Sequence, residues 1–187
     1  MAQAQLNERL QAQERALTKV VEERLSDLAK RVGDNLSQNT TQTNETMTKL
    51  QERLAVIDAA PGVGLAAPQI GINKRIIVMD VARHDAKPEP LKLVNPEVMS
   101  ASDVIVLREE GCLSFPQQYA EVERPETVHI RYINENSEVK ELQAEGLAAI
   151  CIQHEIDHLD GVLLTDRLSS IKRNIIMRKM KKLKKLG

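Results

Sequence analysis

Two histidines and a glutamate stand close together in the sequence, at His154, Glu155 and His158. On a helix, residues four positions apart share one face, so both imidazoles could bind one divalent metal ion. Glu155 would then lie beside that ion as a general base. This H-E-x-x-H spacing indicates metal-assisted hydrolysis, but it leaves open the third metal ligand and the bond that is cut.

Two cysteines compete as the third ligand. Cys112 follows a glycine at the end of a strand-like run, where a thiolate is well placed to reach the histidines. Cys151 lies three residues before His154, although its apolar neighbours favour a place in a pocket wall. The downstream carboxylates Asp160 and Asp166 do not stand in the motif that supplies the glutamate ligand of thermolysin-like peptidases. A thiolate with two imidazoles suits Fe(II), Zn(II), Ni(II) or Co(II).

A glycine-rich segment, Gly62–Gln69, is a further candidate for the site. Its two glycines allow the backbone to approach a ligand closely. The side-chain amide of Gln69 could donate a hydrogen bond to a developing oxyanion. The segment lacks the lysine and the spacing of a phosphate-binding loop, so we expect it to contact a different kind of substrate.

The elements that position these residues are predicted to be short strands and one helix. Runs rich in β-branched residues predict strands at 75–81, 91–94, 104–107, 128–133 and 139–142. The apolar spacing then changes to a helical one, which predicts a helix that begins near Glu145 and ends at Gly161. Several strands with one central helix predict an α+β fold.

The two ends of the chain differ from this middle part. Residues 1–60 contain no proline and one glycine, and apolar residues recur at three- and four-residue steps. This pattern predicts a long helix or coiled coil that could self-associate, with a break in the polar stretch 37–44. Residues 169–187 carry eight basic residues and no acidic one, which predicts a basic amphipathic helix. Residues 61–168 form the expected catalytic domain.

The composition limits the kind of protein. The formal net charge of −1 provides no overall field that would attract nucleic acid. Apolar residues make up 42% of the chain but aromatic residues only 2%, so the core is expected to be aliphatic. Two cysteines, no signal peptide, and no apolar run of the roughly 20 residues that span a membrane predict a cytoplasmic protein without a membrane partner.

Three segments resemble, in this order, the motifs of peptide deformylase: GVGLAAPQ at Gly62–Gln69, EGCLS at Glu110–Ser114 and HEIDH at His154–His158. The resemblance covers roughly residues 61–187 and implies mixed sheets around a central metal-binding helix. It implies that Cys112, His154 and His158 hold the metal, which is Fe(II) in the physiological form of the family. Glu155 would take a proton from the attacking water and pass it to the leaving amine.

The resemblance also implies a substrate, a nascent chain that begins with N-formylmethionine and is hydrolysed to formate and a free amino terminus. Gln69 and the backbone amide of Leu113 would form the oxyanion hole, and Gly64 with neighbouring backbone would pair with the peptide as an added strand. The basic tail resembles the element that docks bacterial deformylases on the ribosome. The methionine pocket would be lined by Val63, Leu147, Ile150 and Cys151.

Residues 1–60 are unlike the N-terminal segment of that family. They resemble the coiled-coil part of RmuC-type DNA recombination proteins, for example at Glu45–Leu54, and we infer no recombination function from them. The helix through Leu50, Leu54 and Ile57 is expected to replace, in part, the helix that the family has there. The alternatives to a deformylase are a metallopeptidase and an inactive deformylase remnant attached to a helical interaction or oligomerisation module.

Overall fold

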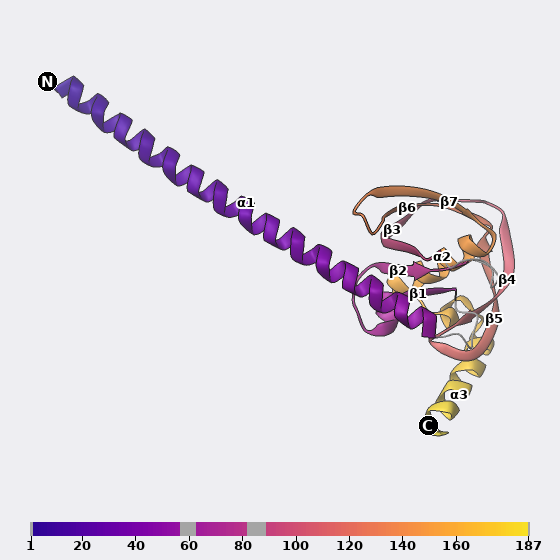
Figure 1. Ribbon diagram of the computed structural model, residues 1–187. Helices are drawn as coiled ribbons and strands as arrows, with labels where there is room; N and C mark the ends of the chain where they lie inside the picture. Colours follow the sequence, from indigo (N-terminus) through magenta and orange to yellow (C-terminus); the bar gives the residue numbers. More distant parts are fainter. Residues whose placement is uncertain (1, 57–62, 82–88, 187) are drawn as a thin grey trace. The chain divides into compact units, whose positions relative to one another are not determined.

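The computed structural model describes residues 2–56, 63–81 and 89–186 (Figure 1). The chain divides into two compact units, Met1–Thr43 and Asn44–Gly187. The described part of the first unit is helical throughout, whereas that of the second contains the β-strands and several shorter helices. The predicted α+β fold is therefore confirmed.

Helix α1 runs without interruption over Ala2–Val56. The break predicted within 37–44 is wrong, because this polar stretch is helical as well. The Thr40 hydroxyl donates a hydrogen bond to the backbone carbonyl of Leu36 at 2.9 Å, and Thr41 makes the same kind of bond one residue later. Such bonds satisfy the hydroxyls inside the helix, and the propensities of Gln, Asn and Thr are within about 0.7 kcal/mol of Ala.

Five strands form the main sheet in the order β1-β2-β3-β6-β7, with neighbouring strands antiparallel. Four of them overlap predicted strands, and β1 does not. The three residues of β1 belong to the glycine-rich segment, whose composition favours a loop, and pairing with β2 overrides that preference. The strands are β1 Gly64–Ala66, β2 Ile76–Met79, β3 Leu91–Ala101, β6 Thr127–Ile133 and β7 Val139–Glu145.

Helix α2, Gly146–Leu159, packs on one face of this sheet, where its apolar residues join a core that includes Ile77 of β2. Gly146 starts the helix with a φ of 57°, a left-handed conformation that glycine adopts without strain. Gly161 follows the helix with a φ of 78°, in the role predicted for it. The helix predicted to begin near Glu145 is confirmed.

The last turns of α1 belong to the second unit and cover the other face of the sheet. Met47 and Leu50 are buried in a cluster with Val78 of β2. The helix is therefore part of the core at Leu50, and its replacing a family helix stays a prediction. The side chain of Leu54 and all of Ile57 lie outside the described residues. Both faces of β2 are therefore buried, which accounts for its uninterrupted apolar sequence.

A separate two-stranded sheet carries the first cysteine. Strand β4, Ile105–Cys112, pairs antiparallel with β5, Phe115–Pro125, and the register shifts between Gly111 and Cys112. Strand β4 extends the run predicted at 104–107, and β5 is absent from the predicted strands. Its sequence contains no β-branched run, and one of its buried residues is Arg124, a type that usually indicates an exposed position.

Two helical segments close the chain. The short 3₁₀ helix η2, Leu164–Arg167, leads into α3, Ser170–Leu186, which is the predicted basic helix. Ile176 of α3 is buried in the same cluster as Phe115 of β5. Among the described helices, none combines the length and the apolar character needed to cross a membrane.

Candidate metal centre

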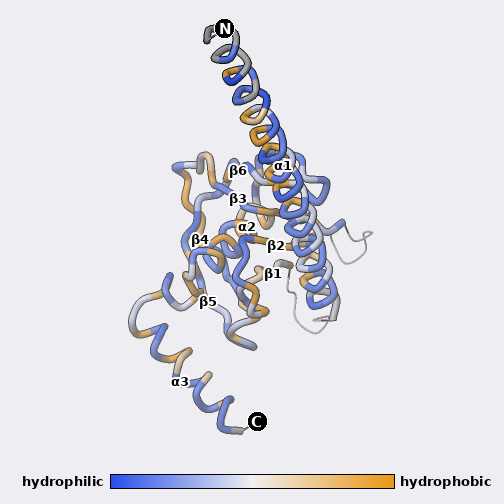
Figure 2. Tube along the Cα trace, turned by 90° about the vertical axis from the view of Figure 1, so that its left-hand side faces the viewer, coloured by the Kyte–Doolittle hydropathy of each residue, from blue (hydrophilic) through white to orange (hydrophobic). Residues whose placement is uncertain are grey.

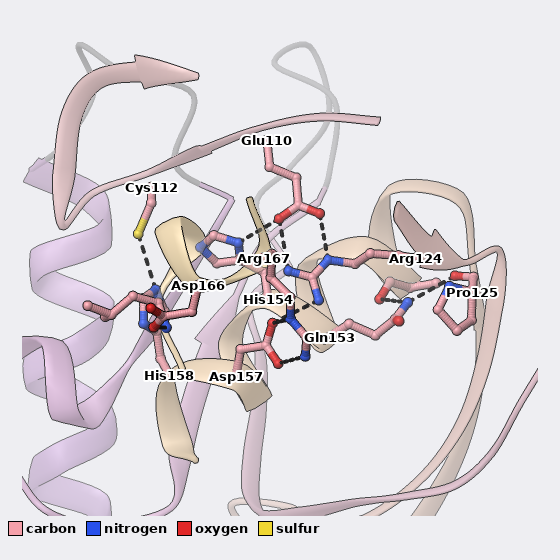
Figure 3. Close-up of polar contacts among 12 residues, drawn as sticks. Glu110, Cys112, Arg124, Pro125, Gln153, His154, Asp157, His158, Asp166 and Arg167 are labelled. Carbon is pink, nitrogen blue, oxygen red and sulfur yellow. Dashed lines mark hydrogen bonds and ion pairs between the residues drawn. The ribbon is translucent and has the colours of Figure 1, made fainter. Parts of the chain in front are cut away.

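The three residues expected to bind metal meet at one place in the second unit (Figure 3). Cys112 ends β4, and His154 and His158 lie one turn apart on α2. Their possible ligand atoms lie within 4.8 Å of one another, and all three residues are buried. The Sγ of Cys112 is 3.2 Å from Nε2 of His158. The packing of a hairpin against a helix thus joins donors that are far apart in the sequence.

The donor set fits a divalent transition-metal ion. One sulfur and two ring nitrogens suit transition-metal ions of intermediate softness. Bonds from such an ion to its ligands are about 2.0–2.3 Å long, so the donor atoms must lie close to one another. Oε2 of Glu155 is buried beside them and has no hydrogen-bond partner in the described part of the chain. Buried polar atoms in proteins almost always have a partner, so this oxygen indicates a site built for a further polar group.

In the metal-free protein the cluster favours a thiolate and an imidazolium. Burial opposes ionisation of the Cys112 thiol, but its contacts with His154 and His158 outweigh burial and lower the thiol pKa to about 6. Burial also disfavours a charged His154, but Cys112 and Glu110 raise the pKa of its imidazole to about 10. A bound cation would take the place of the imidazolium proton, so metal binding is expected to release protons.

The buried carboxylate of Glu155 has an unusual environment. Burial raises its pKa to about 7, because the apolar surroundings disfavour the charged form more than His154 and His158 favour it. Gly64 of β1 lies against it, since a Cβ added at Gly64 would be 2.8 Å from Oε1 of Glu155. A carboxyl group with a pKa near neutrality can both accept and release a proton.

The other candidate third ligands are engaged elsewhere. Cys151 packs beneath β1, where burial raises the pKa of its thiol, and a Cβ added at Gly64 would be 2.6 Å from its Sγ. Asp160 pairs with Arg75, and Asp166 accepts a hydrogen bond from the backbone of Leu163. The structure therefore gathers Cys112 with the histidines and leaves Cys151 in a wall, as its apolar neighbours suggested.

Gln69 presents its amide nitrogen toward the cysteine segment. It lies in the 3₁₀ helix η1, Ala67–Ile70. Its Oε1 accepts a hydrogen bond from the backbone N–H of Ala66 at 2.7 Å, and its Nε2 donates to Oγ of Ser114 at 3.3 Å. Nε2 is also 4.0 Å from Sγ of Cys112. The backbone donor fixes the orientation of the amide, so a donor faces the metal centre, as an oxyanion stabiliser requires.

A cavity of about 700 Å³ opens beside the cluster. Its lining contains Cys112 and His154, with Glu155, Gln69 and Leu113, so two of the three expected ligands and all the expected catalytic groups share one space. The five residues expected to contact substrate line it too: Val63, Gly64, Leu147, Ile150 and Cys151. Five lining residues of β5 were not indicated by any motif: Phe115, Pro116, Gln117, Gln118 and Tyr119.

Buried charges lie behind the histidines: Arg124 was not indicated by any motif, and Glu110 and Asp157 stand inside two motifs but had no expected role (Figure 3). Nδ1 of His154 lies 2.8 Å from Oε2 of Glu110, and Arg124 donates to both oxygens of Glu110 at 2.5 and 3.0 Å. Arg124 also donates to Asp157 at 2.9 Å. Burial opposes ionisation of Glu110, but His154 and Arg124 outweigh it and lower the carboxyl pKa. An ionised Glu110 only accepts, so Nδ1 of His154 keeps its proton and Nε2 is the nitrogen that would lose its proton to bind metal.

A family model described as polypeptide deformylase matches residues 15–174. The chain belongs to the polypeptide deformylase family. A peptide deformylase of Phenylobacterium zucineum is 52% identical over 139 residues, which cover 74% of this chain and 82% of that protein. Two solved deformylase structures are also similar. That from Ehrlichia chaffeensis has a TM-score of 0.70 and 33% identity and covers 76% of this chain and 83% of its own. That from Legionella pneumophila has a TM-score of 0.68 and 40% identity, with coverage of 76% and 82%.

The deformylase match extends beyond the three motifs. It begins at residue 15 and so includes much of α1, which the sequence alone had set apart from the family. The resemblance of residues 1–60 to RmuC-type proteins gains no support from these matches. Membership of the deformylase family implies a divalent metal ion, and the Cys112, His154 and His158 group is one that could hold it.

Proposed function

We propose that this chain is a peptide deformylase, which hydrolyses the formyl amide at the N-terminal formylmethionine of nascent polypeptides and releases formate. One observation carries the proposal. Cys112, His154 and His158 converge beside the buried Glu155, the cavity next to them is lined by Cys112, His154 and Glu155, and the chain is a member of the deformylase family.

Cys112, His154 and His158 would hold one divalent ion through Sγ and two ring nitrogens. We propose Fe(II) as the ion in the cell, with Zn(II), Ni(II) and Co(II) suited to the same donors. When bound, such an ion polarises a carbonyl group and lowers the pKa of water. Glu110 would keep His154 in the tautomer whose Nε2 is free to bind, which favours a single orientation of the ring.

Glu155 would act as the general base and then as the general acid. Its unpartnered Oε2 would accept a proton from the attacking water and return it to the leaving amine. The raised pKa of its carboxyl group, about 7, supports this double role, because such a group both takes up and releases a proton readily at neutral pH.

Gln69 and Leu113 would stabilise the charge that develops on the formyl oxygen. The Nε2 of Gln69 already faces the cysteine segment, held there by the bond between its Oε1 and the backbone of Ala66. Leu113 directly follows Cys112 at the hairpin turn and lines the cavity, which favours its backbone N–H as the second donor.

The substrate would bind along β1. This strand is at the end of the main sheet, so its outer backbone groups at Gly64 are available to pair with a peptide as an added strand. The methionine side chain would fill the apolar part of the cavity, where its burial contributes roughly 2 kcal/mol. The apolar wall would be formed by Val63, Leu147, Ile150 and Cys151.

Formate release tests the proposal directly. The protein, purified without oxygen and analysed for bound metal, should release formate from formyl-Met-Ala-Ser and leave the internal amides of acetyl-Met-Ala-Ser intact. Glu155→Gln should abolish turnover and keep the metal, while Asp160→Asn, an exposed carboxylate at the end of the same helix, should keep both. Cleavage of internal amides would indicate a metallopeptidase instead, and failure to bind metal would indicate an inactive remnant.

We further propose that α3 docks this deformylase on the ribosome, in the cytoplasm. Its eight basic residues form no acidic pairs within the helix and would attract RNA phosphates. Removal of residues 181–187 deletes four of these charges but keeps the buried Ile176. Ribosome binding should become weaker and less sensitive to salt, while formate release from short peptides should not change.

The first unit would pair with a second copy of this chain. Its described part exposes a stripe of large apolar side chains, each 47–66% exposed. Figure 2 shows hydrophobic residues recurring along α1 between hydrophilic ones. Such a stripe is stable in water when it packs against an equivalent helix. The exposed apolar residues are Leu10, Leu17, Val20, Val21, Leu25, Leu28, Val32 and Leu36.

A further inference from the structure

Arg167 connects the buried charges behind the metal centre to the protein surface. It lies in η2, between α2 and α3, and its side chain is 45% exposed. Its Nε donates to Oδ2 of Asp157 at 3.0 Å, and its Nη2 donates to Oδ1 of the same carboxylate. One guanidinium therefore holds both oxygens of a buried carboxylate on α2 (Figure 3).

The contacts continue inward through groups of alternating charge. Oδ2 of Asp157 accepts a hydrogen bond from Arg124, and Arg124 holds both oxygens of Glu110. Glu110 in turn accepts the bond from Nδ1 of His154. The ion-pair chain, as we name this series, runs from Arg167 through Asp157, Arg124 and Glu110 to His154.

We propose that Arg167 is a positioning residue for His154 and acts on it through the ion-pair chain. The inference rests on the proposed function in one respect, the assignment of a metal ion to Cys112, His154 and His158. No motif of the sequence pointed to Arg167, and it touches neither the three ligands nor the cavity beside them.

In the metal-loaded protein, where His154 is neutral, the charges in the chain balance only when Arg167 takes part. Glu110 and Asp157 are two buried carboxylates, and Arg124 by itself would have to neutralise both. Without Arg167, Asp157 would draw more strongly on Nη1 of Arg124. The planar guanidinium binds both oxygens of Glu110 in one orientation, so this pull would loosen that contact. Glu110 would then hold the ring of His154 less firmly, and Nε2 would be less well aimed at the metal.

The test compares Arg167→Gln with Arg75→Gln in the full-length protein loaded with Co(II). Arg75 is a matched control, because its side chain is 41% exposed and pairs with Asp160 at the end of the same helix, outside the ion-pair chain. The transfer of Co(II) to EDTA is followed through the thiolate-to-cobalt absorption band. We expect Arg167→Gln to release Co(II) about 10-fold faster, the lower end of the effect of losing a partner of a metal ligand. Arg75→Gln should change the rate less than about 2-fold.

A merely structural role would lower the unfolding temperature of the metal-free protein without changing the release of Co(II). Equal release rates in the two variants, or a wild-type rate in Arg167→Gln, would therefore overturn the proposal. Arg167→Lys keeps the charge but holds the two oxygens of Asp157 less well, so its release rate should fall between those of wild type and Arg167→Gln.

A double variant tests the route of the effect. If Arg167 acts through Asp157, then Arg167→Gln combined with Asp157→Asn should release Co(II) no faster than Asp157→Asn alone. If the two substitutions each increase the release rate and their effects add in the double variant, the route through Asp157 is contradicted. If Asp157→Asn does not fold, the release rate of Arg167→Lys, expected between those of wild type and Arg167→Gln, is the test that remains. Formate release is a separate readout. If the variants release Co(II) at the expected rates but the wild-type protein releases no formate, the proposed function is refuted and the role of Arg167 is retained.

Discussion

Nδ1 of His154 lies 2.8 Å from Oε2 of Glu110, and this contact joins an expected metal ligand on α2 to a carboxylate on β4. Cys112 lies on the same strand, two residues after Glu110, so both side chains point to the same side of β4. One strand and one helix therefore supply the sulfur, the two imidazoles and the carboxylate that orients one of them. The geometry of the centre depends on how these two elements pack.

Glu110→Gln should weaken metal binding by about 10- to 100-fold. A neutral amide is a weaker acceptor for Nδ1 of His154, and Arg124 would lose the charge that holds it. The affinity is measured by competition with a chelator of known strength. Glu97→Gln on β3 is the control, because this carboxylate is exposed and is not among the residues that line the cavity. An unchanged affinity in Glu110→Gln would show that the contact does not support the metal centre.

Gly64→Ala should lower kcat by on the order of 100-fold, because displacement of a catalytic group by about 1 Å can have that effect. The new Cβ would lie 2.6 Å from Sγ of Cys151 and 2.8 Å from Oε1 of Glu155, so the glutamate must shift. The metal content should stay the same, since the expected ligands are not among the atoms it meets. Gly33→Ala is the control, because an added Cβ there meets no atom within 4 Å. Full activity in Gly64→Ala would contradict the assigned position of the base.

Removal of the metal should expose one reactive thiol, at Cys112. In the metal-free protein its pKa of about 6 leaves the thiol mostly ionised at pH 7, whereas burial raises the pKa of Cys151. Iodoacetamide should therefore label Cys112 first, as read by peptide mass spectrometry, and the rate should fall as the pH drops below about 6 because the thiolate becomes protonated. Prior addition of Zn(II) should protect Cys112. Faster labelling of Cys151, or no protection by the metal, would argue against this ligand set.

The sequence could indicate the histidine pair because its geometry is local. Any helix places His154 and His158 on one face, whatever surrounds it. The choice between Cys112 and Cys151 could not be made in this way, since both are compatible with local spacing. It depends on the packing of β4 against α2. The apolar neighbours of Cys151 favoured Cys112 only weakly, and the resemblance to a family favoured it more strongly before the structure did.

The ion-pair chain was harder to anticipate. Glu110 and Asp157 lie inside recognisable motifs, but their partner Arg124 is on β5, whose sequence did not predict a strand. A charged residue read from sequence is expected at the surface, and Arg124 is instead 3% exposed. One feature of the sequence did indicate the buried position of Glu110. Glu110 and Cys112 are two residues apart in a strand-like run, so the carboxylate is expected on the same buried side as the thiol.

Leu50→Ala should destabilise the second unit by about 2–5 kcal/mol, the range for removing a buried leucine side chain. Leu50 is fully buried under the main sheet although it belongs to a helix whose earlier residues are exposed. The free energy of unfolding is measured with urea. Lys30→Ala is the control on the same helix, because Lys30 is exposed on the side away from the apolar stripe, and its cost should stay within about 0.5 kcal/mol. Equal costs would mean that the end of α1 does not serve as part of the core.

Leu28→Asp should convert a self-associated protein into a monomer. Leu17 and Leu28, Val21 and Val32, and Leu25 and Leu36 are each 11 residues apart, a repeat that keeps the apolar stripes of two helices in contact through a right-handed supercoil. A carboxylate in the middle of that stripe would be desolvated against its counterpart in the second copy. Light scattering measures the mass, and Ser26→Asp, on the opposite side of the helix, should leave it unchanged. A monomeric wild-type protein would refute the pairing without affecting the metal centre, because Cys112, His154 and His158 all belong to the second unit.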